Sequence, residues 1–353
     1  MNRKIALLAA SALVLVEPWA LAQAQDLTDP TAEEIIVTAR KRQESILKVP
    51  VVETVIDSDT LQQSQITDIQ AVTTKVPGLF VGTSVLAIGS QISLRGVGTS
   101  ALDAGIDQSV SLNIDGQQFS QGLTFKSGLF DLAQAEVLKG PQALFFGKNS
   151  PGGVIALTTA DPKDYFEIIA RGSYELVARE KRTELILSGP LSDTLGARLA
   201  GTWSDRDGYF KNTAVAIPGL GGTTLGGRNG GNENWIVRGT LVWNPSADFK
   251  ARLKVNVTRD NSNSPTGLQG VSCPSGTGPG ALGIQFIGGT HPCQQDDEVE
   301  YVGMDPNFFG GLFPDGSPAL RNDGVPFTDI RQRFGVLEMD YNVTPDILLT
   351  STT

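Results

Sequence analysis

The sequence predicts an α+β domain followed by the antiparallel strands of a transmembrane β-barrel. Three observations support this fold class. The first residues have the pattern of an export signal, the middle of the chain mixes short strands with a helical stretch, and the residues after 161 alternate between apolar and polar side chains. Such alternation over about ten residues is typical of outer-membrane strands, which turn one face to lipid.

Composition excludes several classes of function. The chain has 353 residues, with 28 Lys and Arg against 38 Asp and Glu, and a formal net charge of −10. This acidic balance argues against a nucleic-acid partner, because phosphates favour clustered basic residues. One His and two Cys argue against a zinc or iron site, so we expect no cofactor. No convergent set of acid, base and nucleophile is apparent, and we expect no enzymatic activity.

Residues 1–24 are predicted to be a cleaved signal peptide. A basic start, Met1 to Lys4, precedes the apolar stretch Ile5 to Val16, and Ala22-Gln23-Ala24 provides small residues at a cleavage site. The alternative is a transmembrane anchor, but a spanning helix needs about 20 apolar residues.

Residues 25–48 are predicted to be a periplasmic tail that contains a short β-prone run. The run Glu33 to Ala39 is followed by the basic cluster Arg40-Lys41-Arg42. Such a run is either an edge strand of the domain that follows or a segment that adds a strand to the open sheet edge of a partner.

Residues 49–160 are predicted to form the compact α+β domain. Asp57 or Ser58 caps a helix that we expect to extend through Gln70, and Val76-Pro77-Gly78 ends it. Alternation and turn residues place the strands of this domain at 51–56, 79–81, 91–95, 109–114, 136–141 and 154–159.

Residues 161–353 are predicted to be the first part of the barrel. We expect strands at 165–175, 182–189, 197–206, 234–243, 249–259 and 331–342, with another beginning at 346. Short turns join some of these strands, whereas the connections 207–233 and 260–330 are long, and this division of loop lengths is typical of outer-membrane barrels. A soluble β-sandwich is the alternative. Seven strands leave an open sheet in lipid, so we expect the chain to be a fragment.

The two faces of these strands differ in polarity. Leu199 and Trp203 share one face of the third strand, and Arg198 and Thr202 share the other. Trp235 and Trp243 stand on the apolar face of the next strand, about 20 Å apart along the barrel axis, which suits the two aromatic girdles of a membrane barrel.

A series of short motifs supports a family resemblance. Val76-Pro77-Gly78, Ile92 to Gly96, Ile114-Asp115-Gly116, Glu136 to Gly147 and Gly152 to Ile155 follow one another in the order found in the plug domains of TonB-dependent outer-membrane receptors, which this chain resembles. The motif residues are Arg95, Gly96, Asp115, Gly116, Glu136, Lys139, Gly140, Pro141, Gly147, Gly152 and Gly153. The earlier run resembles a TonB box: Glu33, Glu34, Ile35, Ile36, Val37, Thr38 and Ala39.

The resemblance implies a plug domain inside a 22-stranded barrel in outer-membrane lipid. It implies uptake driven by TonB and its inner-membrane energising complex, with a ferric siderophore as the default substrate. Vitamin B12, a glycan or an aromatic compound are alternative nutrients. A passive porin or adhesin is a further alternative, although such a protein has neither a TonB box nor a plug.

Two further interpretations stay open at this point. Arg95, Glu136 and Lys139 either hold the plug to the barrel lumen through ion pairs or are ordinary solvated turn charges. Cys273 and Cys293, in a Gly- and Pro-rich stretch of an exported chain, either form a disulfide or remain free thiols.

Overall fold

The structure is a computed structural model. It describes residues 36–37, 44–49, 52–83, 90–99, 107–119, 129–213, 221–224, 227–262, 297–299, 302–304 and 321–353. The expected signal peptide and the expected pair Cys273 and Cys293 lie outside the described residues.

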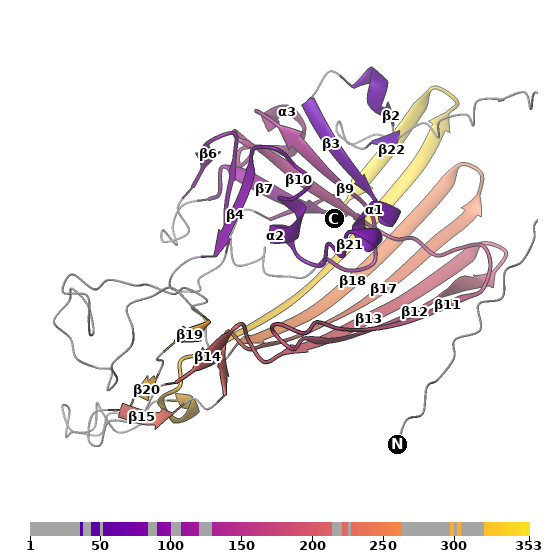
Figure 1. Ribbon diagram of the computed structural model, residues 1–353. Coiled ribbons are helices and arrows are strands. Elements are labelled where there is room, and N and C mark those ends of the chain that lie inside the picture. The colour runs from indigo at the N-terminus through magenta and orange to yellow at the C-terminus, as the bar shows by residue number, and fades with distance from the viewer. Residues whose placement is uncertain are drawn as a thin grey trace, which may run out of the picture. The chain divides into compact units, whose positions relative to one another are not determined.

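A five-stranded sheet forms the centre of the α+β region, by which we mean the elements β3 to β10 (Figure 1). Its strands, in spatial order, are β3 (Val52–Asp57), β9 (Leu132–Lys139), β10 (Gly153–Thr159), β7 (Val110–Ile114) and β8 (Gln117–Phe119). Strand β10 is antiparallel to β9 and parallel to β7. Both faces of the inner strands are covered, and the fully enclosed residues of β7, β9 and β10 form the core of the region.

A smaller sheet and three short helices complete the α+β region. The sheet consists of β4 (Leu79–Thr83), β5 (Ser90–Leu94) and β6 (Val97–Gly98), and the helices are α1 (Ser58–Gln63), α2 (Ile69–Val72) and α3 (Ala143–Phe146). Ahead of these elements, β1 (Ile36–Val37) pairs with β2 (Glu44–Ser45), which leads into η1 (Ile46–Lys48).

The single helix expected from 58 to 70 is wrong, because the chain forms α1 and α2 instead. Gln65 adopts a left-handed conformation with φ of 49°, and the amide of Ile66 donates back to the carbonyl of Leu61, which ends α1. Asp68 then caps α2 by accepting from the amide of Ala71 at 2.7 Å, as Asp57 caps α1. The second capping Asp therefore starts a new helix.

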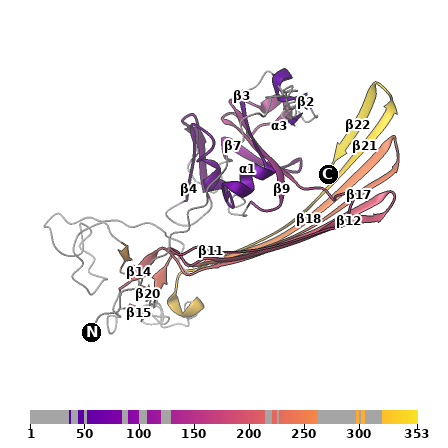
Figure 2. The ribbon, with the colours of Figure 1, turned by 45° about the vertical axis from the view of Figure 1, so that its right-hand side comes forward.

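Seven strands in consecutive antiparallel order form what we call the long sheet (Figure 2). They are β11 (Glu167–Tyr174), β12 (Lys181–Ser192), β13 (Leu195–Arg206), β17 (Asn232–Ser246), β18 (Phe249–Ser262), β21 (Thr328–Thr344) and β22 (Ile347–Thr352). Each expected strand is present, and several extend further than the alternation predicted. The expected fold class, an α+β domain followed by antiparallel strands, is confirmed.

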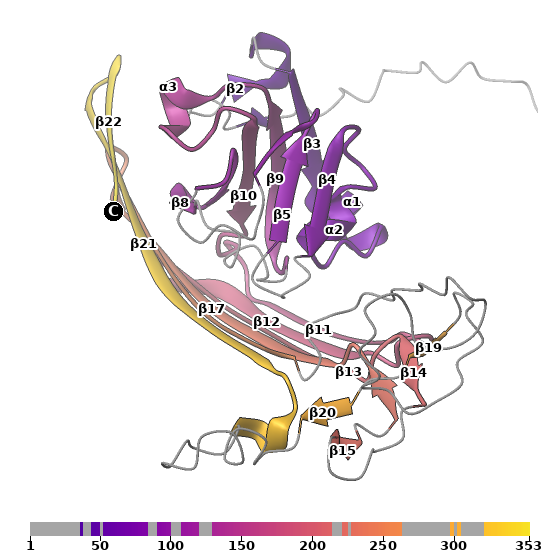
Figure 3. The same ribbon diagram turned by 90° about the vertical axis from the view of Figure 1, so that its left-hand side faces the viewer.

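The two faces of the long sheet differ as the alternation predicted. On β13 the apolar side chains Leu199 and Trp203 are exposed, whereas Arg198 and Thr202 are buried. The same alternation recurs along β17 and β18. Figure 3 shows that the sheet curves along its length. The chain therefore turns apolar side chains outward and places polar and charged ones on the inner face, the reverse of a soluble protein.

The turns at one end of the long sheet are short. The strand pairs β12–β13, β17–β18 and β21–β22 close at Ser192 and Leu195, Ser246 and Phe249, and Thr344 and Ile347. The expected long connections contain short elements among their described residues: β14 (Phe210–Asn212), β15 (Gly221–Thr224), β16 (Arg228–Asn229), β19 (Glu298–Val299), β20 (Val302–Met304) and η3 (Arg321–Gly324). No helix in the described part of the chain is long and apolar enough to cross a membrane.

Aromatic residues gather near both ends of the outer face. Near the short turns, the rings of Trp243 and Phe249 meet edge to face at 6.0 Å, and Phe249 pairs with Tyr341 on β21. Toward the other end, Trp203 pairs with Trp235. Aromatic side chains at both borders of an apolar band are typical of strands that cross a lipid bilayer.

Candidate functional site

Two motif pairs form tight two-residue turns in the α+β region. Asp115 and Gly116 join β7 to β8 with φ values of 50° and 89°, and Arg95 and Gly96 join β5 to β6 with φ values of 52° and 82°. Positive φ at both central residues defines the type I′ turn, which matches the twist of the strands it joins. The geometry of these turns explains why Gly occupies the second position in both motifs.

The remaining glycines of the motif series lie around β9, α3 and β10. At Gly153, where φ is 146°, an added Cβ would meet the carbonyl oxygen of Leu138, so the close approach of β10 to β9 requires glycine there. Gly140 and Pro141 follow β9, Gly147 follows the last residue of α3, and Gly152 directly precedes β10. These residues shape the backbone and take no part in the ion pairs described below.

A buried ion pair joins the start of β9 to the long sheet. Arg198 on β13 donates to both carboxylate oxygens of Asp131, at 2.9 and 2.6 Å, and the two side chains are only 6% and 4% exposed. Glu167 lies 3.5 Å from the same guanidinium. Arg238 on β17 donates to the carbonyl oxygen of Phe130 at 2.7 Å. Two neighbouring strands thus hold the segment that enters β9.

A second buried cluster lies where the α+β region passes into the long sheet. The ammonium of Lys254 on β18 lies 3.0 Å from Asp115, 2.8 Å from the carbonyl oxygen of Thr159 and 3.2 Å from Asp161. Asp115 also accepts from the amide and the hydroxyl of Thr159. Burial works against the charge of Asp161, but Lys254 and Arg252 outweigh it and hold the pKa of Asp161 below its usual range.

The two clusters are adjacent on the inner face of the long sheet. Arg198 pairs in register with Thr240, which pairs in turn with Lys254, so the two cations stand in one row across β13, β17 and β18. Opposite them, the α+β region presents Asp131 and Asp115. Removing one partner of a buried ion pair costs roughly 3–5 kcal/mol, because it leaves the other charge uncompensated. These contacts therefore specify how the α+β region is attached to the long sheet, and the loss of any one partner is costly.

The three charges proposed from sequence to make such an attachment lie elsewhere. Glu136 is enclosed within the α+β region, where it accepts from Gln134 at 2.7 Å. Arg95 lies in the β5–β6 turn, and Lys139 is the last residue of β9. Among the described residues, the ion pairs to the long sheet come instead from Asp115, Asp131 and Asp161 and from strand cations.

Sequence reasoning missed Arg198, Lys254 and Asp131 as members of the site. Arg198 and Lys254 each stood on the polar face of an expected strand. A charged side chain at the centre of a membrane strand is costly unless it faces the interior of the barrel. That signal points to an interior partner. It does not identify Asp131, which precedes Arg198 by 67 residues.

Two of the seven residues of the expected TonB box are described. Ile36 is partly exposed, whereas Val37 is fully buried among Leu138, Phe146 and other apolar residues. The side-chain amide of Gln134 donates to the carbonyl oxygen of Ile36 at 3.1 Å. Glu33, Glu34, Ile35, Thr38 and Ala39 lie outside the described residues.

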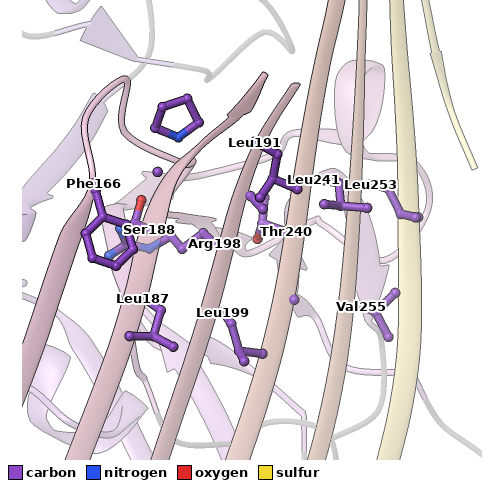
Figure 4. Close-up of a pocket in the computed structure, with 14 residues that line it drawn as sticks. Phe166, Leu187, Ser188, Leu191, Arg198, Leu199, Thr240, Leu241, Leu253 and Val255 are labelled. Carbon is purple, nitrogen blue, oxygen red and sulfur yellow. The ribbon is translucent and has the colours of Figure 1, made fainter. Parts of the chain in front are cut away.

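An apolar hollow of about 490 Å³ lies on the long sheet (Figure 4). Its walls include outward-facing Leu199, Leu241 and Leu253, with Ser188 and Arg198 at its polar side. Because the wall consists mainly of side chains from the apolar outer face, this hollow does not have the chemistry of a chamber for a polar substrate.

Comparison with known proteins agrees with this architecture. Residues 45–154 match the family described as the TonB-dependent Receptor Plug Domain. The pesticin receptor of Yersinia pestis is 31% identical over 212 residues, which are 58% of this chain and 30% of that protein. The ferrienterobactin receptor of Escherichia coli is 28% identical over 289 residues, which are 74% of this chain and 38% of that protein.

Solved structures show the same fold. The ferric yersiniabactin uptake receptor from Yersinia pestis matches with a TM-score of 0.63 at 21% identity, over 86% of this chain and 40% of that one. The fold and the buried contacts define a plug domain joined to outer-membrane strands. Residues 45–154 thus belong to the plug domains of TonB-dependent receptors, and the chain spans less than half of the length of the relatives named above.

Proposed function

We propose that this protein imports a scarce substrate across the bacterial outer membrane and that TonB, driven by its inner-membrane complex, supplies the energy. In this proposal residues 33–39 are the TonB box, residues 49–160 are the plug, and residues 161–353 belong to the barrel. Residues 1–24 direct export, and residues 25–48 form the periplasmic tail that TonB reaches.

One observation carries the proposal: β1 lies ahead of the α+β region and is attached to it through its main chain and one buried side chain. An extended segment of this kind can pair with an open sheet edge of a partner, because main-chain hydrogen bonds supply affinity. Buried ion pairs hold the rest of the region to the long sheet. A pull on β1 therefore acts on a domain that is fixed elsewhere.

A ferric siderophore is the proposed substrate. This choice is supported by one relative named for ferrienterobactin and by the solved receptor named for ferric yersiniabactin uptake. Two other relatives are named hemin receptors, so iron in another carrier is the nearest alternative. Vitamin B12, glycans and aromatic compounds are more distant alternatives.

Substitution of Val37 by proline tests the proposed TonB box. Proline has no N–H and fixes φ, so it removes a main-chain donor that strand addition needs. We expect V37P to reduce uptake of the labelled substrate to the level of a strain without TonB, while substrate binding to whole cells is unchanged. V37A is the matched control, because it removes the side chain and keeps the main-chain donor. Undiminished uptake by V37P would reject the assignment.

Growth on iron-limited medium tests the substrate. Cells with and without the receptor receive single ferric siderophores, hemin or vitamin B12 as supplements. We expect growth to depend on the receptor with at least one siderophore. If only hemin or vitamin B12 restores the difference, the siderophore proposal is wrong. Uptake that does not require TonB at all would favour a passive porin.

A further inference from the structure

The face of the α+β region on which β1 lies contains buried carboxyl groups as well as apolar side chains. Val37 is fully enclosed in a cluster with Leu138, Phe146, Val154 and Ala156, and Ile46 and Val49 of the η1 segment pack against the same cluster. Leu138 and Glu136 are two residues apart on β9, so they point to the same face. The segment formed by β1, β2 and η1 therefore covers this face.

Gln134 connects β1 to the carboxylate of Glu136. Its amide nitrogen donates to the carbonyl oxygen of Ile36 at 3.1 Å and to Glu136 at 2.7 Å. A primary amide has two N–H groups, and both find acceptors here. The position of Gln134 thus depends on Glu136, and the position of Ile36 depends on Gln134.

Glu53 is a second carboxyl group on the same face. In the pairing of β3 with β9, Glu53 stands opposite Leu138 and Val55 stands opposite Glu136, which makes Glu53 and Glu136 diagonal neighbours. Both carboxyl oxygens of Glu53 are enclosed. Burial, together with the adjacent carboxylate of Glu136, raises the pKa of Glu53 to about 8. A neutral Glu53 can donate to Glu136, whereas an ionised Glu53 can only accept.

Other charged residues occur on the elements that pack here. Asp57 ends β3 on this face, and its bonds to the first turn of α1 hold the pKa of that carboxyl below its usual range. Glu44 lies on β2 and Lys48 on η1. The described residues of β10 and α3 are uncharged. The basic cluster Arg40 to Arg42 lies outside the described residues.

We propose that Glu53 and Glu136 form a proton-sensitive seat for β1, in which Gln134 is the positioning residue and the loss of the proton held at Glu53 releases the segment. The inference rests on the proposed function in one respect, namely that β1 is the segment that TonB takes. It adds that the supply of free β1 depends on pH at the periplasmic side as well as on substrate.

The direction of the effect follows from linkage. While β1 covers the seat, Glu53 holds its proton up to a pH near 8. When β1 leaves, water reaches the carboxyls and Glu53 ionises at its ordinary, lower pKa. The covered state therefore binds more protons. Its population is highest at low pH and falls as pH rises from about 4.5 to about 8.

Accessibility of a cysteine at position 37 tests this directly. The complete receptor carrying V37C is purified without TonB or substrate, and the rate of maleimide labelling at residue 37 is measured by peptide mass spectrometry at pH 6 and pH 8.5. The neighbouring variant I36C, at a partly exposed position, corrects for the pH dependence of thiol reactivity. We expect the corrected rate at residue 37 to rise roughly 70-fold between the two pH values, as the covered and uncovered pKa values of about 8 and 4.5 require.

Second-site variants identify the groups responsible. E53Q keeps the shape of the side chain and carries no titratable proton, so it should make the corrected V37C rate independent of pH. Q134A should expose residue 37 at both pH values, while Q63A, at an exposed glutamine of α1, should change nothing. Hydrogen exchange of β9 and β10 checks that each variant keeps the plug folded.

Three outcomes would overturn the inference: free labelling of V37C at pH 6, a corrected rate that does not change with pH, or the same pH response in E53Q. None of these bears on the TonB box, because the assay contains no TonB. Conversely, full uptake by V37P would reject the TonB assignment and leave the proton-sensitive seat standing.

Discussion

The two attachments of the plug differ in kind, although both involve the first residues of β9. Asp131, just before β9, is held by Arg198 in a buried ion pair with two hydrogen bonds. Gln134, three residues later, donates one hydrogen bond to the carbonyl oxygen of Ile36, and the buried side chain of Val37 adds an apolar contact to this attachment of β1. A hydrogen bond between neutral groups contributes about 1 kcal/mol net, far less than the cost of breaking a buried ion pair.

The difference indicates an order of release. When β1 is pulled, the contact with Gln134 yields before the attachment at Asp131. The plug therefore stays attached to the long sheet while β1 becomes available to pair with a partner. A stronger pull is transmitted along the chain through β2 and η1 to β3, which pairs with β9. The following predictions test whether the attachments have this ranking.

The largest effect is expected from R198M. Methionine has a similar length and no charge, so Asp131 keeps its buried carboxylate and loses its partner. We expect the plug to lose roughly 3–5 kcal/mol of stability, measured as the urea concentration at which the amides of β9 lose hydrogen-exchange protection. The double variant R198M/D131N should recover part of this loss, because it also removes the buried charge. An unchanged midpoint in R198M would mean that the ion pair does not attach the plug.

A smaller effect is expected from K254M. Lys254 contacts three acceptors, but Asp161 keeps Arg252 and Asp115 keeps the amide and hydroxyl of Thr159. Because the acceptors retain other partners, we expect a loss of about 1.5–3 kcal/mol in the same assay. A loss greater than that of R198M would reverse the ranking of the two clusters.

The smallest effect is expected from D207N, which serves as a surface reference. Asp207 lies 3.9 Å from Arg179, and the two side chains are 45% and 55% exposed. An exposed pair at this distance contributes about 0–1 kcal/mol, so the urea midpoint in the same assay should hardly move. A shift as large as that of K254M would show that exposed pairs on the loop side also stabilise the protein.

Local signals in the sequence predicted the strands of the long sheet well. Apolar and polar residues alternate with the period of a strand, and an outward face of Leu and Trp does not depend on distant parts of the chain. The tight turn at Asp115 and Gly116 was predictable for the same reason, because its positive φ values need particular residues. The break between α1 and α2 was missed although Asp68 offered a second cap, since Leu61, Ile66 and Ile69 fit the apolar side of one continuous helix.

The partners of the buried charges were not predictable in the same way. Asp115 has a local role in its turn, and the same carboxylate meets Lys254, 139 residues later in the chain. Glu136 was expected either to contact the barrel or to be a solvated turn charge, and it is instead buried and accepts from Gln134. Period and turn chemistry place a side chain on a face, but they do not specify which face of another element will cover it.

The sequence by itself determined the inward and outward faces of the strands of the long sheet and the residues of the tight turns. These depend on interactions between residues close together in the chain. Only the tertiary structure decided that Asp131 and Asp115 meet a row of strand cations and that Val37 packs against the face of β9 that carries Glu136. Those contacts join residues far apart in sequence, and their energies depend on burial, which exists only once the chain has folded.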